Sequence, residues 1–367
     1  MKLRYKITGS ILGLVVLALS ALAVTISYNS GCTEPAPIAG DAEQMNAVLY
    51  RCYGSAEVLK LEKAEKPKPA DNEVLVKVHA AGVNPLDWHY MRGSPYLMRL
   101  MSGIGAPDDS RMGVDFAGTV EAVGKDVRQF KPGDNVFGGA SGAFAEYVTI
   151  REDRALALIP DNQFVEQSAG VAIAGITALQ ALRDKGQLKP GQRVLINGAS
   201  GGVGTFAVQI AKSMGAEVTG VCSTRNVDMV RSIGADHVFD YKKEDYTKSG
   251  QTYDLIIDNV GNHSLLKNRA VLKPNGKLVM LGGSTGNWIG PLTRPIQALL
   301  LSPFVDQEFI MILAHLNKED MEFLAGLMES GKVNTVIDKM YKLQDIRDAI
   351  SYSEEGHARG KIIVSVE

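Results

Sequence analysis

The sequence has few cysteines and no strong charge of either sign. Only three cysteines occur in 367 residues, Cys32, Cys52 and Cys222, and they are spaced too widely for a zinc knuckle or a framework of disulfides. No structural metal is therefore expected. A formal net charge of −2 gives no electrostatic reason to expect nucleic acid as a partner. An apolar content of 45% with 38 glycines is ordinary for a globular α/β protein, and the length is sufficient for two domains.

A glycine-rich stretch lacks the lysine that a nucleoside triphosphate site requires. A strand pattern over 194–197 runs into Gly201 and Gly204 and then into an apolar-periodic helix over 205–214, with Ala199 where the first glycine of such motifs usually stands. Gly201 lets the backbone approach a pyrophosphate, and Gly204 lets the helix pack closely on the strand. No Lys-Ser or Lys-Thr follows, so this is not a Walker loop. The pattern predicts a dinucleotide site, the alternative being a glycine-rich turn without a ligand.

The next strand, over 217–223, ends without the carboxylate that usually binds the ribose 2′-OH of NAD. Ser223, Thr224, Arg225 and Asn226 stand there instead. Hydroxyls and a guanidinium suit a 2′-phosphate because they form charge-assisted hydrogen bonds with it. The sequence therefore predicts NADPH rather than NADH. The alternative is that Arg225 is a solvated cation at the start of a helix.

The first 44 residues differ in character from the rest of the chain. Three cations precede an uncharged, mostly apolar run over 7–28, which at about 20 residues is long enough to cross a bilayer as a helix. This predicts an enzyme anchored by one N-terminal helix in a bacterial-type inner membrane, with the face of the membrane left open. Two alternatives are a cleaved signal peptide, with a small-residue site at 21–23, and a lipoprotein site at Cys32.

The remaining chain shows two patterns of elements. From Met45 to about Val148, short strands such as 73–78, 118–124 and 135–138 are separated by turn signals, which predicts a partly open β-barrel. After a helical stretch over 174–182, strands and helices alternate, which predicts a doubly wound parallel sheet with ligands at the carboxyl ends of its strands. The expected elements are helix 227–233, strands 237–241 and 253–259, helix 263–272, a turn at 273–276, strand 277–281, helices 318–330 and 345–354, and strand 361–366.

The expected domain order follows from these patterns. It is a leading segment and linker over 1–44, the first part of a catalytic domain over 45–169, a dinucleotide-binding domain over 170–310, and a return to the catalytic domain over 311–367.

Six stretches of the chain carry a family resemblance in the same order. They are AGVNPLD at 81–87, GVDFAG at 113–118, GDNVFG at 133–138, NGASGGVG at 197–204, DNVG at 258–261 and GHARGK at 356–361. From about Met45 to Glu367 the chain resembles the zinc-independent branch of the medium-chain dehydrogenase/reductase superfamily. More narrowly, it is similar to the quinone oxidoreductase group, including its mitochondrial reticulon-interacting relatives. This resemblance implies a Rossmann domain joined to a GroES-like catalytic domain.

The sequence departs from the zinc-using branch of that superfamily. Asn84 occupies the position of the first zinc ligand, and Val114 and Asp115 replace a His-Glu pair. The lobe that holds a structural zinc on four cysteines is also missing. The resemblance therefore implies an enzyme without a metal.

The resemblance also implies which residues hold the cofactor. Ser200, Gly201, Gly202 and Val203 hold the pyrophosphate beside Gly204, and Ser223, Arg225 and Tyr241 surround the adenine ribose phosphate. Asn259 and Leu281 line the crevice, while His357, Ala358 and Arg359 arrive from the tail and close over the cofactor. Tyr241 has an alternative interpretation as a half-buried aromatic at a strand end, and His357 as a surface-loop histidine.

Asn84 and Asp87 are the candidate catalytic residues, because the family places this loop against the nicotinamide. Without a metal, the amide NH₂ of Asn84 can donate a hydrogen bond to the substrate carbonyl. Asp87 has a structural alternative, in which it braces a turn. No Tyr-x-x-x-Lys proton donor is evident, so the proton is expected from water or the cofactor ribose, with Lys361 and His89 as weaker candidates.

The activity that these features favour is reduction of quinones, enones or alkenals with NADPH. The expected partners are a small electrophile, namely a quinone or enone, and the membrane at the N-terminal segment. A homodimer is compatible with this interpretation. The alternatives are an enoyl-thioester reductase and a membrane-tethered NADPH-binding module with little turnover. For the reduction of quinones, enones or alkenals, positioning of the cofactor's hydride supplies most of the catalysis.

Overall fold

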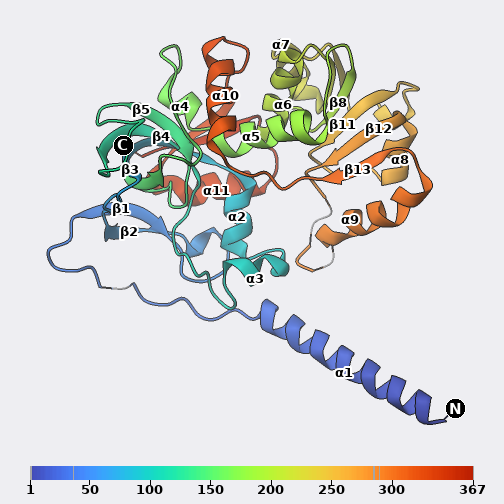
Figure 1. Cartoon of the computed structure of the whole chain (residues 1–367), viewed down its shortest axis with the longest axis horizontal. Helices are drawn as coiled ribbons and strands as arrows, with labels where there is room; N and C mark the ends of the chain where they lie inside the picture. Colours follow the sequence, from blue (N-terminus) through green and yellow to red (C-terminus); the bar gives the residue numbers. More distant parts are fainter. Residues whose placement is uncertain (1, 36, 284–285, 289, 367) are drawn as a thin grey trace.

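Two sheets make up most of the fold in this computed structural model, which describes residues 2–35, 37–283, 286–288 and 290–366 (Figure 1). The α/β part contains a six-stranded parallel sheet in the order β10-β9-β8-β11-β12-β13. Its strands are β8 (Arg193–Asn197), β9 (Glu217–Cys222), β10 (His237–Asp240), β11 (Tyr253–Asp258), β12 (Leu272–Met280) and β13 (Glu308–Met311). The strand order reverses at β8, which confirms the predicted doubly wound sheet and places its switch point between β8 and β11.

Helices connect these strands and cover the sheet (Figure 1). They are α5 (Ala172–Gln180), α6 (Gly202–Ser213), α7 (Val227–Ser232), α8 (Leu265–Ala270) and α9 (Gly290–Leu301). Val194, Leu195 and Ile196 of β8 are all fully buried, as expected for a central parallel strand that is covered on both faces.

The second sheet has seven strands around the long strand β3. Its path is β14-β15-β3-β4-β5-β7, and β6 pairs with β3 away from this path. The strands are β3 (Glu73–Val83), β4 (Asp115–Val123), β5 (Asn135–Gly139), β6 (Tyr147–Arg151), β7 (Leu156–Leu158), β14 (Ile337–Lys342) and β15 (Lys361–Ser365). On one side of β3, residues 73–77 pair with β6 and residues 80–83 pair with β15. This divided pairing curves the sheet into the predicted GroES-like, partly open barrel.

The tail after β13 consists of α10 (Lys318–Glu329), α11 (Ile346–Glu354) and the strands β14 and β15. The antiparallel pairing of β15 with β3 brings this tail back to the sheet of the first domain. The boundaries at 169/170 and 310/311 stay predictions.

Shorter elements complete the chain. They are β1 (Gln44–Leu49), β2 (Lys60–Glu65), α2 (Pro85–Arg92), α3 (Arg99–Ser102), α4 (Val165–Ser168), a π-helical turn at Ala181–Lys185, and 3-10 turns at Ala56–Val58, Tyr96–Met98, Thr224–Asn226, Tyr246–Lys248, Ser302–Phe304 and Leu343–Asp345. Strands β1 and β2 form an antiparallel pair of their own.

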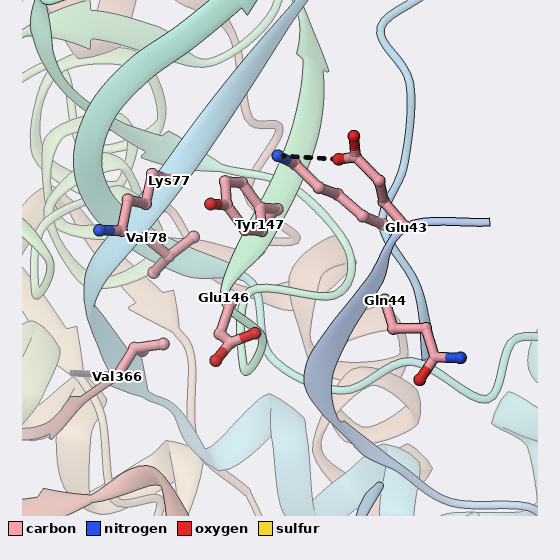
Figure 2. Close-up of a pocket in the computed structure, with 8 residues that line it drawn as sticks. Glu43, Gln44, Lys77, Val78, Glu146, Tyr147 and Val366 are labelled. Atoms are coloured by element: carbon pink, nitrogen blue, oxygen red, sulfur yellow. Dashed lines mark ion pairs between the residues drawn. The ribbon is translucent and has the colours of Figure 1, made fainter. Parts of the chain in front are cut away.

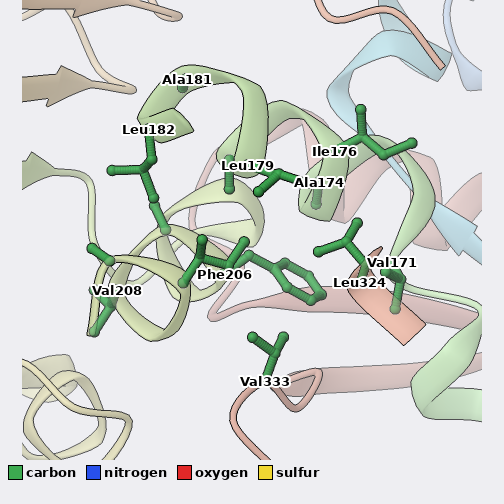
Figure 3. Close-up of a cluster of buried hydrophobic side chains, with 14 of the residues drawn as sticks. Val171, Ala174, Ile176, Leu179, Ala181, Leu182, Phe206, Val208, Leu324 and Val333 are labelled. Atoms are coloured by element: carbon green, nitrogen blue, oxygen red, sulfur yellow. The ribbon is translucent and has the colours of Figure 1, made fainter. Parts of the chain in front are cut away.

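The largest hydrophobic cluster joins α5, α6 and α10 beneath the parallel sheet (Figure 3). Phe206 of α6 and Leu324 of α10 are both fully buried in it. Apolar residues recur at helical spacing on the inner faces of these helices, so burial of one stripe of each helix builds this core. Because α10 belongs to the tail and α6 to the glycine-rich unit, the cluster fixes the tail against the dinucleotide half.

Three details of the fold differ from the sequence prediction. The predicted turn at 273–276 lies inside β12 as an irregularity of its pairing, with Asn275 at φ 61°. The predicted helix 263–272 is shortened to α8 by Ser264, whose hydroxyl caps it through the Lys267 amide. Helices α2, α3, α4 and α9 and strands β13 and β14 were not predicted.

Helix α1 (Lys2–Ser27) forms where the apolar run was expected, and it extends away from the body of the protein (Figure 1). In the part of the chain that the structure describes, no helix is both long enough and apolar enough to cross a membrane. The predicted membrane anchor and membrane localisation are therefore wrong.

The end of α1 is attached to the catalytic domain. Arg99 is buried, and its guanidinium donates to the carbonyls of Ile26 at 3.1 Å and Tyr28 at 3.0 Å, so it caps the C-terminus of the helix. The Ser30 amide donates to the Gly105 carbonyl at 2.8 Å.

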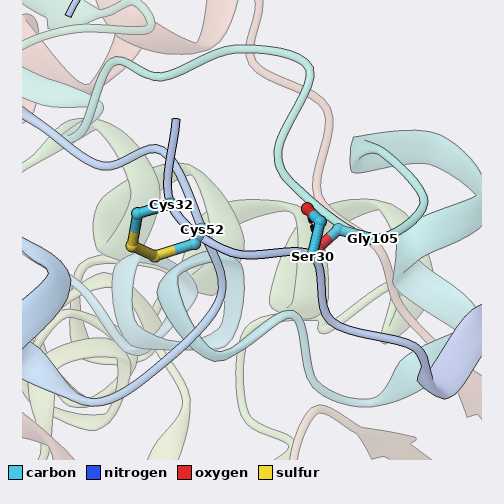
Figure 4. The surroundings of a disulfide bond; sticks show 4 residues. All are labelled: Ser30, Cys32, Cys52 and Gly105. Atoms are coloured by element: carbon cyan, nitrogen blue, oxygen red, sulfur yellow. Dashed lines mark hydrogen bonds between the residues drawn. A yellow bond between two sulfur atoms is a disulfide. The ribbon is translucent and has the colours of Figure 1, made fainter. Parts of the chain in front are cut away.

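A disulfide joins Cys32 to Cys52 close to this attachment (Figure 4). The inference from cysteine spacing was wrong for this pair, because the chain between them folds back and separation in the sequence does not set distance in space. In this disulfide Cys32 has no free thiol, which also argues against a lipid attached there.

Candidate functional site

The glycine-rich loop lies at the carboxyl end of β8, where α6 begins. A Cβ added at Gly204 would overlap the backbone of Gly198 and Ala199, so only glycine permits this close packing of helix on strand. The first-turn amides of α6 have no partner within the helix, as at any helix N-terminus. Ser200, Gly201, Gly202 and Val203 are only partly covered, so this end of the helix is open to an anionic ligand.

The tail of the chain touches the glycine-rich loop. The Gly360 amide donates to the Ser200 carbonyl at 2.8 Å, and Gly201 and Gly360 form an isolated parallel bridge. One Arg225 terminal nitrogen donates to the His357 carbonyl at 2.5 Å. The structure therefore brings Arg225 and His357 together, while Ala358 lies half-buried and Arg359 exposed in the same tail segment.

Asn226 is a residue of this region that the sequence prediction did not select. It is buried after β9, and its side-chain nitrogen lies 3.0 Å from Ser200 Oγ and 3.3 Å from Ser223 Oγ. Its side-chain oxygen is buried and has no partner. Asn226 thus links the glycine-rich loop to the end of β9 and keeps one acceptor free for a ligand.

A groove of about 370 Å³ lies at the carboxyl ends of the neighbouring strands. Its lining includes Val221, Tyr241, Lys242, Lys243 and His263. Tyr241 is 55% exposed, which agrees with a ring that one face of a planar ligand can cover. Both lysines add positive charge near the position where the sequence predicts a 2′-phosphate, although Glu244 and Asp245 line the same groove.

The crevice at the switch point contains a buried polar network. The Asn197 side-chain nitrogen donates to Asp258 Oδ1 at 2.8 Å, and the Asn259 side-chain nitrogen donates to the Asn197 carbonyl at 3.0 Å. Asn259 Oδ1 is buried without a partner, and Leu281 lies half-buried at the end of β12. Asp258 also forms a fully buried ion pair of 2.6 Å with Arg294 of α9, which the sequence did not reveal.

Asn84 and Asp87 lie at the start of α2 and are both buried. Asp87 Oδ2 accepts a hydrogen bond of 2.7 Å from the Asn84 backbone amide, so Asp87 does brace the turn that begins the helix. The pKa of Asp87 is raised to about 7, mainly by burial and to a lesser extent by the nearby Asp115, while the Asn84 amide and Lys361 oppose the rise.

The side chain of Asn84 is engaged within the protein. Its amide nitrogen donates to the Gly82 carbonyl at 3.2 Å, and its oxygen accepts from Lys361 Nζ at 2.6 Å. A hydrogen bond from Asn84 to a substrate carbonyl therefore requires its NH₂ group to leave or share its present contact. Lys361 Nζ also lies 3.0 Å from the Val83 carbonyl and 3.3 Å from Asp115 Oδ2.

A second groove, of about 530 Å³, lies on the barrel between β1, β3 and β6 (Figure 2). Lys66 forms an ion pair of 3.4 Å with Glu43 there and lies over the Tyr147 ring. None of the predicted site residues lines this groove, and it is separate from the crevice between β8 and β11.

Comparisons with known proteins agree with this arrangement. Residues 70–161 match the family described as "Alcohol dehydrogenase GroES-like domain", and residues 233–364 match "Zinc-binding dehydrogenase". The chain is 35% identical over 337 residues to the "Chloroplast envelope quinone oxidoreductase homolog" of Arabidopsis thaliana, covering 87% of this chain and 98% of that protein. It is 38% identical to the "Trans-enoyl reductase pgmF" of Aspergillus terreus, covering 84% and 92%. A solved structure of Escherichia coli quinone oxidoreductase complexed with NADPH matches with TM-score 0.75 at 25% identity, covering 88% and 100%.

The chain belongs to the quinone oxidoreductase-like family of medium-chain dehydrogenases/reductases. The resemblance stated from the six sequence stretches is thereby confirmed for the enzyme part of the chain, whereas its N-terminal membrane segment is not.

One of the two matching families is described as zinc-binding, but the residues at the corresponding site of this chain are of a different kind. In this quinone oxidoreductase-like chain, Asn84 and Asp115 lie around the ammonium group of Lys361, not around a set of Cys and His donors. Zinc sites are built from Cys, His and carboxylate ligands, and a buried ammonium 3.3 Å from the carboxylate would repel a second cation. Among the described residues, no group of three or more His, Cys, Asp or Glu side chains could hold a metal. These residues do not fit a catalytic zinc.

Proposed function

We propose that the protein is an NADPH-dependent reductase of conjugated electrophiles, such as quinones, enones and alkenals. The observation that carries this proposal is the crevice at the carboxyl ends of β8 and β11, where the glycine-rich loop, the free side-chain oxygens of Asn226 and Asn259, and the tail converge. The relatives named quinone oxidoreductase and trans-enoyl reductase act on this class of acceptor.

The residues fit the cofactor in three places. The N-terminal amides of α6 suit the pyrophosphate, and the end of β9 offers Ser223 and Arg225 to a 2′-phosphate. The carboxylate of Asp240 on the neighbouring strand β10 is already engaged by Thr224 Oγ1 at 2.7 Å and by Lys243 at 3.3 Å. Asn259 Oδ1 supplies a buried acceptor in the crevice. When bound, NADPH supplies a hydride from its nicotinamide ring to the electrophilic carbon.

The chain's own contribution to catalysis is positioning and exclusion of water. The contact of Arg225 with the His357 carbonyl holds the tail beside the end of β9, so the tail can cover a bound dinucleotide. The loop from Gly82 to Asp87 is the part of the catalytic domain that we assign to the substrate side. The roles of Asn84 and Asp87 in this loop are likewise proposals.

An enoyl-thioester reductase is the second candidate, because one relative at 38% identity carries the name trans-enoyl reductase. The two candidates differ in whether the site admits a thioester with its pantetheine arm.

Assembly as a homodimer is a further proposal that sedimentation velocity would test.

The decisive experiment measures NADPH oxidation at 340 nm with purified protein against quinones, enals, enones, a simple aldehyde and crotonyl-CoA. We expect turnover with quinones or conjugated carbonyls and little with the aldehyde, since hydride addition without a metal favours a conjugated carbon. Turnover with crotonyl-CoA alone would favour the thioester candidate. If NADPH binds, as measured by its fluorescence, but no acceptor oxidises it, the protein is a binding module and the proposal fails.

A further inference from the structure

Lys361 is a buried cation at the contact between the two halves of the protein. It is only 2% exposed, at the start of β15 in the tail. Its Nζ lies within hydrogen-bond distance of Asn84 Oδ1, the Val83 carbonyl and Asp115 Oδ2. A lysine ammonium has three N–H donors, so these three acceptors satisfy it fully.

The backbone beside Lys361 contacts the glycine-rich loop. Gly360 donates to the Ser200 carbonyl and lies at φ 85°, where an added Cβ would overlap the Val336 carbonyl. Only glycine fits this position without strain. The Lys361 amide donates to the same Val336 carbonyl at 2.8 Å, and a Cβ added to Gly202 would lie 3.5 Å from Lys361 Cδ.

This dipeptide therefore contacts both functional loops. Gly360 is bonded to the loop that holds the cofactor, and the Lys361 side chain is bonded to the loop from Gly82 to Asp87. Asp115, the counter-ion of Lys361, accepts in turn from the Ile173 amide at the start of α5.

The charges around Lys361 explain why its replacement by a neutral residue is expected to destabilise the folded protein. Asp115 from β4 and Asp87 from α2 are both buried, and they are near enough to each other for Asp115 to raise the pKa of Asp87. Burial raises the pKa of Asp115, and Lys361 is the main influence that opposes the rise. A buried carboxylate without its partner cation is strongly destabilising.

We propose that Lys361 is a positioning residue for the reduction, which couples the cofactor loop to the loop carrying Asn84 and Asp87. Its ammonium fixes the Asn84 side chain and the start of α2 at a set distance from the glycine-rich loop. This inference rests on the proposed function for its kinetic consequence, but the coupling itself is a property of binding.

The test uses the full chain with four variants. Lys361→Met removes the charge and keeps the stem. Lys361→Met combined with Asp115→Asn also removes the unpaired carboxylate, so it separates positioning from a loss of stability. Lys361→Arg keeps the charge but changes its shape, and Lys342→Met on β14 is the matched control at an exposed lysine.

Two measurements read the coupling. The first measurement compares kcat with the Kd for NADPH. In the double variant we expect kcat to fall roughly 10- to 100-fold, since misplacement of reacting groups by about 1 Å costs up to about 100-fold in rate. The Kd for NADPH should change by less than about threefold, because the cofactor loop itself is unchanged. We expect Asp87 to give the pH profile of the wild type an inflection near pH 7, and in the single Lys361→Met variant this inflection should move to higher pH, because Lys361 lowers the pKa of Asp87.

The second measurement is hydrogen exchange of residues 82–92 with and without NADPH, which needs no turnover. In the wild type and Lys342→Met, NADPH should slow this exchange, and in the double variant the effect should be lost. A double variant with wild-type melting temperature, kcat and NADPH-dependent protection would overturn the proposal. If the wild type lacked turnover but showed this protection and the double variant lost it, the coupling would stand and the proposed function alone would fail.

Discussion

Selection of NADPH by the end of β9 is the most direct prediction from the site. Arg225 is exposed there, and one of its five N–H donors bonds to the His357 carbonyl at 2.5 Å. The remaining donors are available to a 2′-phosphate. Arg225→Ala should therefore weaken NADPH selectively, whereas Ser223→Asp should favour NADH by accepting from the 2′-OH and repelling the phosphate.

The size of the effect follows from exposure. A hydrogen bond to a charged group is worth roughly 1.5–3 kcal/mol, but salt screens an exposed guanidinium, so the low end applies. At about 1.4 kcal/mol per factor of ten, Arg225→Ala should lower kcat/KM for NADPH about tenfold and change that for NADH by less than about twofold.

The assay is steady-state kcat/KM for both nucleotides with one electrophile, at low and at high salt, on the wild type and each variant. Arg231→Ala on α7 is the matched control, because Arg231 is also an exposed arginine near the end of β9. An equal loss for both nucleotides in Arg225→Ala would mean that the side chain only holds the tail through His357. Selection of the phosphate by Arg225 would then be refuted.

Four further predictions concern stability and metal. Because the pKa of Asp87 rises from 3.8 to about 7 on folding, the folded state binds this proton more tightly, and the associated stability is lost as pH rises from about 4 to 7; Asp87→Asn should flatten that decline in melting temperature. Activity should survive a metal chelator, and about one zinc per chain lost together with activity would contradict the site described above. Cys52→Ser should lower the free energy of unfolding by roughly 3 kcal/mol, as expected for a closed loop of about 20 residues, and an unchanged denaturant midpoint would argue against the disulfide. In the Cys52→Ser background, where neither chain has the disulfide, a chain that begins at Met45 should melt below one that begins at Val24, because it leaves the buried Arg99 guanidinium without the Ile26 and Tyr28 carbonyls.

The dinucleotide half was predictable because its signals are local. The strand 194–197, the glycines that follow it and the helix beyond occur within about 20 residues, and their order alone determines where a ligand binds. The missing carboxylate after Cys222 is equally local. Helix α9 escaped prediction because Gly290 and Pro295 are helix-breaking signals, yet it supplies Arg294 to the crevice.

The features that were missed depend on contacts between distant segments. Cys32 and Cys52 meet because the chain between them folds back, and spacing in the sequence carries no record of this. The apolar composition of the leading run suggested a membrane span, but composition does not include the docking of the helix end through Arg99. Asn226 lies in the stretch that the sequence analysis considered for the 2′-phosphate, but it was not selected as a site residue. Only the structure shows that it is buried between Ser200 and Ser223.

The loop from Gly82 to Asp87 shows why a motif can identify a position without fixing its role. Asn84 was selected because the family places its loop against the nicotinamide, and because its side-chain NH₂ can donate a hydrogen bond to a substrate carbonyl without a metal. The structure instead places the Lys361 ammonium between Asn84, Val83 and Asp115. Lys361 belongs to the tail, so its positive charge lies at this loop only when the tail packs against the glycine-rich loop. A metal would instead be held by the GroES-like domain alone. Positive charge at the loop from Gly82 to Asp87 is thus tied to the same segment that contacts the cofactor loop, and this dependence is what the variants of Lys361 are designed to measure.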